Sequence, residues 1–137
     1  MLRFVTLSVA GGLLALLAFA GPTAVSADGK DLDIETIMKK LNGKKGTHKV
    51  IGKALDASPM DWTALTPQTK TYAELAAALG KNKPEKGDLK SWDMLCKEYA
   101  AAAKELEGAA GKKDKDAAKT AFGKLKDSCD NCHENHR

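Results

Sequence analysis

The sequence predicts an all-α protein, an antiparallel up-down bundle of four helices. Three observations support this fold class. Alanine, leucine and lysine dominate residues 28–137, the apolar–polar alternation typical of strands is missing, and glycine and proline divide the segment into four helical pieces. Short connections favour antiparallel neighbours. The alternative is a looser three-helix array with a long irregular segment over residues 43–66.

The first predicted helix lies in the stretch DLDIETIMKKLNG, where apolar side chains recur on one helical face. These are Ile34, Ile37, Met38 and Leu41. Asn42-Gly43 is a typical helix stop, and the following HKVIGKALDA continues or bends the same helix. The second helix is expected over TKTYAELAAALGK, after an irregular beginning caused by Pro59 and Pro67.

The third helix is predicted within DLKSWDMLCKEYAAAAKELEGAAGK, after the linker NKPEKGD. Its apolar stripe consists of Leu89, Trp92, Cys96, Tyr99 and Ala103. The fourth helix is predicted over KDKDAAKTAFGKLKDSCDNCHENHR, with a stripe of Ala118, Phe122, Leu125, Cys129 and Cys132. The apolar face of the last helix therefore leads directly to two thiols.

The first 27 residues have the features of a cleavable export signal. Arg3 precedes an apolar run, and Val25 and Ala27 are small side chains at the expected cleavage site. A retained membrane anchor is the alternative. Residues 28–137 then form one domain of 137 − 27 = 110 residues, with a net charge of 21 − 18 = +3. Its charges are interspersed, so no nucleic acid is expected as a partner.

The ending SCDNCHENHR contains the spacing C-x-x-C-H, which is typical of covalent attachment of a c-type haem. Cys129 and Cys132 can form thioether bonds with the two vinyl groups of one porphyrin, and His133 can bind the iron. Attachment on the exported side of the membrane agrees with the leader. A zinc site would normally draw its ligands from two separated pairs. A redox dithiol would normally accompany a βαβ pattern, which the sequence does not show.

Met38 is the main candidate for the opposite side of the iron, because it lies on the apolar face of the first helix. It could equally be an ordinary core residue, and an iron with an open position remains the alternative. Met60, Met94 and His48 are weaker candidates, and His48 is expected to be solvated. Cys96 is predicted to be a buried thiol, and His136 to lie at the surface or near a propionate.

The C-terminal motif and the helical pattern resemble the cytochrome c′ family, the class II c-type cytochromes. The segment IETIMKKLNG is similar to the start of that family's first helix, and the ending past the motif is similar to its basic terminus. The resemblance implies a four-helix bundle with haem on the last helix, and Arg137 beside that haem. It also implies two subclasses, a low-spin electron carrier with a methionine ligand and a high-spin form that binds NO or CO. A homodimer built on the first two helices is compatible with it.

The sequence as a whole predicts a periplasmic cytochrome with one covalent haem c that transfers electrons between soluble or membrane redox partner proteins. Its site would consist of Cys129, Cys132, His133 and Arg137, with iron bound by His133 and Met38. A five-coordinate form that binds NO or CO is the first alternative, and a structural zinc-binding helical module is the second. No catalytic triad, carboxylate pair or phosphate-binding loop is visible, so an enzyme is not predicted.

Overall fold

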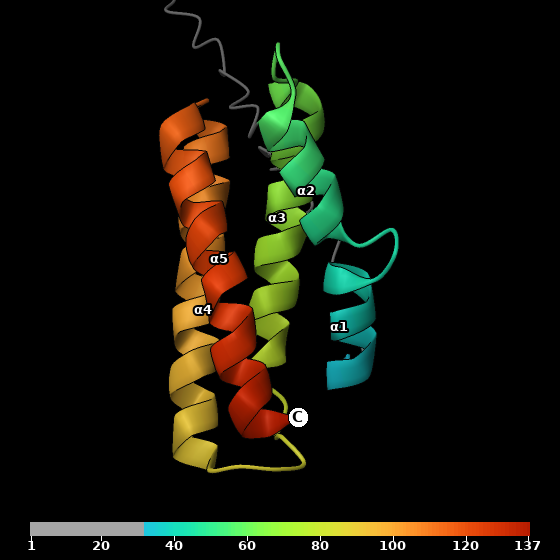
Figure 1. Cartoon of the computed structure of the whole chain (residues 1–137), viewed down its shortest axis with the longest axis vertical. Coiled ribbons are helices and arrows are strands. Elements are labelled where there is room, and N and C mark those ends of the chain that lie inside the picture. The colour runs from blue at the N-terminus through green and yellow to red at the C-terminus, as the bar shows by residue number, and fades with distance from the viewer. Residues whose placement is uncertain (1–31) are drawn as a thin grey trace, which may run out of the picture.

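The computed structural model describes residues 32–137, which form an all-α bundle (Figure 1). Its helices are α1 (Ile34–Asn42), α2 (Thr47–Asp56), α3 (Trp62–Leu79), α4 (Leu89–Gly111) and α5 (Lys115–His136). α1 and α2 run in the same direction and together take the place of the first helix of the bundle. α3, α4 and α5 then alternate in direction. The predicted four-helix bundle is confirmed. The predicted leader, residues 1–27, lies outside the described residues.

The break between α1 and α2 arises at Gly43 and Gly46. A Cβ added at Gly46 would lie 2.4 Å from the Leu41 carbonyl oxygen, and one at Gly43 would lie 2.3 Å from that of Lys39. At these two positions the backbone passes so close to the end of α1 that no other residue type fits without a shift of the backbone. Beyond the break α2 is regular, so the three-helix alternative with an irregular segment over residues 43–66 is wrong.

The second predicted helix begins earlier than expected, at Trp62, and contains Pro67. Asp61 caps it, because its carboxylate accepts a hydrogen bond of 3.1 Å from the Ala64 amide. Pro67 removes one backbone donor near the start of the helix. The Thr66 hydroxyl donates to the Trp62 carbonyl at 2.8 Å, in the turn that precedes the proline. Pro67 therefore lies close to the capped start of α3, within its first two turns.

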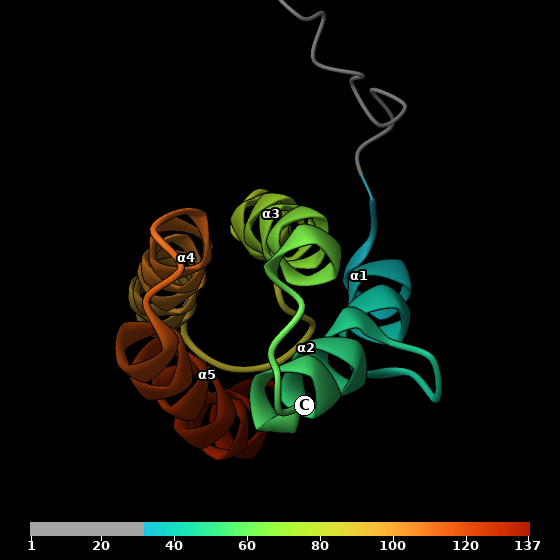
Figure 2. The ribbon, with the colours of Figure 1, turned by 90° about the horizontal axis from the view of Figure 1, so that it is seen from above.

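The core lies between α2, α3, α4 and α5, with α4 packed along both α3 and α5 (Figure 2). α4 buries Trp92, Cys96 and Tyr99, as its stripe predicts, but Leu89 at its first turn is 56% exposed. α1 packs against α2 and α3 and, among the described helices, does not contact α4 or α5. The bundle is therefore open on one side. Within residues 32–137, no helix combines the length and the apolar character that crossing a bilayer requires.

At one end of the open side, the connection between α3 and α4 links the start of α1 to α4 through hydrogen bonds. The Asn82 amide donates 2.9 Å to the Leu32 carbonyl just before α1. The Trp92 indole donates 2.8 Å to the Asn82 carbonyl. These bonds fix the start of α1 relative to α4 across a buried aromatic ring.

Gly87 in this connection should be irreplaceable. Its φ is +88°, and a Cβ there would lie 2.4 Å from both the Asn135 carbonyl oxygen and Nδ1 of His136. We expect Gly87→Ala to lower the free energy of unfolding by roughly 1–3 kcal/mol, through the strained φ and the clash with the end of α5. Urea unfolding followed by circular dichroism measures the change.

Gly123→Ala is the matched control, because this glycine lies inside α5 and its added Cβ would meet nothing within 4 Å. This variant should gain about 0.5–1 kcal/mol from helix propensity. Equal effects of the two substitutions would contradict the role assigned to Gly87.

Candidate haem-binding site

A cavity of about 500 Å³ lies on the open side of the bundle, between α1, α4, the end of α5 and the α3–α4 connection. This volume is within the range of pockets that hold cofactors and drug-sized ligands. Its apolar wall consists of Ile34, Met38, Leu79, Trp92 and Leu95. Charged side chains such as Glu35, Glu85 and Lys86 complete the lining. An apolar wall with charged groups around it suits a flat cofactor whose own charges are confined to one edge.

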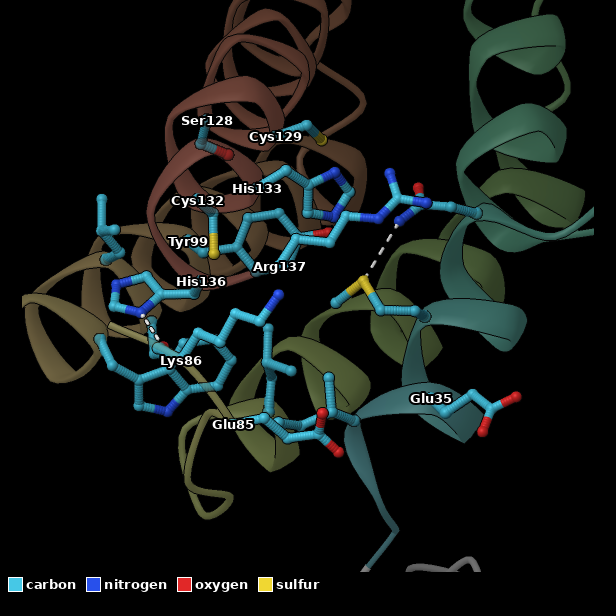
Figure 3. Close-up of a pocket in the computed structure, with 17 residues that line it drawn as sticks. Glu35, Glu85, Lys86, Tyr99, Ser128, Cys129, Cys132, His133, His136 and Arg137 are labelled. Atoms are coloured by element: carbon cyan, nitrogen blue, oxygen red, sulfur yellow. Dashed lines mark hydrogen bonds between the residues drawn. The ribbon is translucent and has the colours of Figure 1, made fainter. Parts of the chain in front are cut away.

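The C-x-x-C-H motif is placed on the last two turns of α5 and lines this cavity (Figure 3). Cys132 and His133 follow Cys129 by three and four residues, so both lie near Cys129 on one side of the helix. Both cysteines are half-buried, whereas His133 is exposed. The Cys129 thiol donates to the Leu125 carbonyl at 3.3 Å. The helix thus presents two sulfurs and one imidazole to the same space.

Burial keeps both thiols in their protonated form near neutral pH. It is the main cause of the raised pKa of Cys129, to which the negative field of Asp130 and Cys132 adds. Burial alone raises the pKa of Cys132. The thiolate is the reactive form of cysteine, so a raised pKa lowers the share of that form, and neither thiol is in a disulfide.

Met38 lines the cavity from α1, on a different wall from the motif. It is half-buried, and the Asn42 amide contacts its sulfur at 3.7 Å, across one turn of the helix. The other sequence-based candidates for this position, Met60, Met94 and His48, do not line the cavity. Met60 packs against the core, and Met94 is 55% exposed. Met38 and His133 are 133 − 38 = 95 residues apart in the sequence, and the fold brings both to the lining of one cavity.

Two residues after the motif also line the cavity, Arg137 and His136. His136 is more tightly held than predicted for a surface residue. Its Nδ1–H donates to the Lys86 carbonyl at 3.0 Å, and its Nε2 then accepts from the Ser91 hydroxyl at 3.2 Å. Its ring meets Trp92 edge-on, with 5.3 Å between centroids. His136 therefore fastens the end of α5 to the α3–α4 connection.

Sequence reasoning missed part of the site. Tyr99 and Cys96 both line the cavity, whereas the sequence pattern predicts no more than a place in the apolar stripe of α4. Cys96 is buried as predicted, and burial, with Cys132 and Asp93 nearby, raises its pKa to about 11. The sequence signal for their place in the site is the three-residue spacing of Cys96 and Tyr99. This spacing puts both side chains on the face of α4 that lies near Cys129 and Cys132 of α5.

The side chains present fit a c-type haem better than zinc. In residues 32–137, no three histidine, cysteine or carboxylate side chains converge on a point where a metal ion could bind. A structural zinc site needs four such ligands. A c-type haem needs two thiols one turn apart, an adjacent imidazole and an apolar space, and all of these are at this cavity.

The family model described as Cytochrome C′ matches residues 87–137, which contain α4, α5 and the whole C-x-x-C-H motif. Met38 lies outside the matched range. No curated protein and no solved structure matches the chain significantly. The match implies a c-type haem and supports a haem-binding c-type cytochrome. Residues 87–137 are therefore similar to cytochrome c′, and this match supports the family resemblance seen in the sequence on that part of the chain.

Proposed function

We propose that this protein is an exported cytochrome that holds one covalent haem c and transfers single electrons between redox partner proteins. One observation carries the proposal. A single apolar cavity brings Met38 of α1 into the same space as Cys129, Cys132 and His133 of α5. When bound there, the haem would supply a reversible one-electron change at iron.

Each residue of the motif has a distinct task in this proposal. Cys129 and Cys132, half-buried on one face of α5, tether the porphyrin edge. His133 binds the iron from the same helix. Arg137 lies at the cavity beyond the motif, where its guanidinium suits a propionate. The tethers and His133 therefore fix the ring relative to α5.

Met38 is proposed as the second iron ligand. Its thioether lines the apolar wall from α1, and α1 is held in place through Ile37 and Leu41, which are fully buried. Histidine–methionine ligation keeps iron low-spin and raises its reduction potential, as an electron carrier requires.

Export and partner binding complete the proposal. The leader pattern of residues 1–27 and the chemistry of c-type attachment both support the periplasm. Lys86 and Arg137 at the cavity would steer an acidic redox partner toward the haem edge. A homodimer remains a prediction of the resemblance.

A five-coordinate cytochrome that binds NO or CO is the second candidate. The contact between the Met38 sulfur and the Asn42 amide favours it, because this hydrogen bond competes with binding of the sulfur to iron. A shift of the ferrous absorption spectrum on addition of CO would support this candidate over the first.

Removal of both tether thiols should abolish covalent haem. We expect purified wild-type protein from a host with a haem-attachment system to carry the added mass of one haem. Cys129→Ala with Cys132→Ala should lack it, because no thioether can form. Intact-protein mass spectrometry gives the result. Cys96→Ala is the matched control. This thiol lines the cavity from α4 but lies outside the C-x-x-C-H motif, so its removal should leave the haem mass unchanged. Wild-type protein without added mass would end the haem proposal.

Substitution of Met38 should change the spin state of the iron. We expect Met38→Ala to replace the sharp visible bands of low-spin ferrous haem with the broad bands of an open site, as recorded by absorption spectroscopy. Met94→Ala removes an exposed methionine and should leave the spectrum as in the wild type. An unaltered spectrum of Met38→Ala would exclude this residue as a ligand.

A further inference from the structure

A hydrogen-bonded chain of three side chains runs from α2 to the cavity. Nδ1 of His48 lies 3.2 Å from the Tyr72 hydroxyl, and the Tyr72 hydroxyl lies 2.5 Å from that of Tyr99. The three residues come from α2, α3 and α4, and Tyr99 lines the cavity. We call these residues the His48–Tyr99 chain. It joins a half-buried imidazole on one side of the bundle to the cavity on the other.

The surroundings hold this chain in one geometry. Tyr72 is fully buried and Tyr99 is 8% exposed, so neither hydroxyl can exchange its partner for bulk water. The His48 ring stacks on Phe122 of α5, with 4.5 Å between centroids and 28° between planes. His48, which the sequence predicts to be solvated, is half-buried, because Tyr72 of α3 and Phe122 of α5 both pack against the ring.

The hydrogen bonds of the chain can point in either of two directions. A tyrosine hydroxyl both donates and accepts, and a neutral imidazole has one nitrogen of each kind. If Nδ1 of His48 accepts, Tyr72 donates to it and Tyr99 donates to Tyr72. If Nδ1 carries a proton, every bond reverses, and the Tyr99 O–H is free to donate toward the cavity. A second proton on His48 makes this reversed direction the only one available.

His48 is the member of the chain that titrates near neutral pH. Burial raises the pKa of Tyr72 to about 12, although its bond to Tyr99 opposes the rise. Burial is also the main cause of the raised pKa of Tyr99, and nearby Tyr72, Cys129 and Cys132 raise this pKa further. Burial and then the positive field of Lys126 on α5 lower the pKa of His48 from its ordinary value. Of the elements packed on α2, α3 presents Tyr72, α5 presents Lys126, and α1 adds no ionisable group to the causes of this shift.

We propose that the His48–Tyr99 chain links electron uptake at the haem to proton uptake at His48, so that the two events favour each other. The proposal rests on the haem cytochrome proposed above. In the linked event a bound haem would supply the one-electron change, with a redox partner as the electron donor, while neutral His48 accepts one proton from water to become imidazolium. Tyr72 and Tyr99 each end with one proton, as they began. An extra electron at the iron would favour a Tyr99 hydroxyl that points its hydrogen toward the cavity. Only the protonated form of His48 makes this direction of the hydrogen bonds the sole one available.

The titration of His48 in both redox states of the holoprotein tests this linkage. NMR follows the imidazole C–H signals against pH in ferric protein and in protein reduced chemically. Linkage requires that reduction raise the proton affinity of His48, and we expect a factor of about five or more. In Tyr72→Phe the ring still titrates, but the factor should fall close to one because the chain is cut.

Two further variants make the test specific. Lys126→Gln removes the neighbouring positive charge, so both titrations should move to higher pH while the factor between them is kept. Tyr99→Phe removes the hydroxyl at the cavity and should lose the factor as Tyr72→Phe does, which covers the case in which the fully buried Tyr72 variant fails to fold.

The outcomes separate the two proposals. A factor of one in wild-type holoprotein would overturn the linkage and leave the cytochrome standing. A factor that persists in both tyrosine variants would also overturn the role of the chain, because the field of the iron would then act on His48 through space. Purified protein without the added mass of one haem would overturn both proposals together.

Discussion

The separation of α1 from α4 and α5 is the constraint on which the rest of the structure depends. Ile37 and Leu41 hold α1 on α3, and the Asn82 bond to Leu32 holds its start. A four-helix bundle would ordinarily close by packing its first helix on its last. Here apolar side chains from both sides face a space instead, which is unfavourable in water unless an apolar group fills it. A tethered porphyrin would supply that group.

Much of this arrangement was readable from the sequence, because it depends on local patterns. The helical spacing of Cys129 and Cys132 after Leu125 placed both thiols on the buried side of the last helix, and the structure agrees. The same reasoning placed Met38 on the apolar face of the first helix, where it lines the cavity. Periodicity works well in these segments because one face of each helix is buried over most of its length.

The remaining features depend on contacts between distant segments, which periodicity does not encode. Pro67 suggested a late start for α3, yet the Asp61 cap and the Thr66 hydroxyl stabilise the earlier turn. His48 stood beside glycines and lysines and looked solvated, but α3 and α5 cover it. His136 is fastened by Lys86, fifty residues earlier in the chain. In each case the partner, rather than the residue's own neighbours in sequence, decides its environment.

The glycine break after Asn42 separates α1 from α2. α2 packs between α3 and α5 as part of the core, whereas α1, among the helices that the structure describes, contacts α2 and α3 alone and buries two side chains completely. Substitutions in α1 can therefore alter one wall of the cavity without disturbing α4 and α5. If the proposed haem is bound there, the nine residues of α1 are the part of the fold through which evolution could retune the chemistry of the iron while the scaffold stays the same.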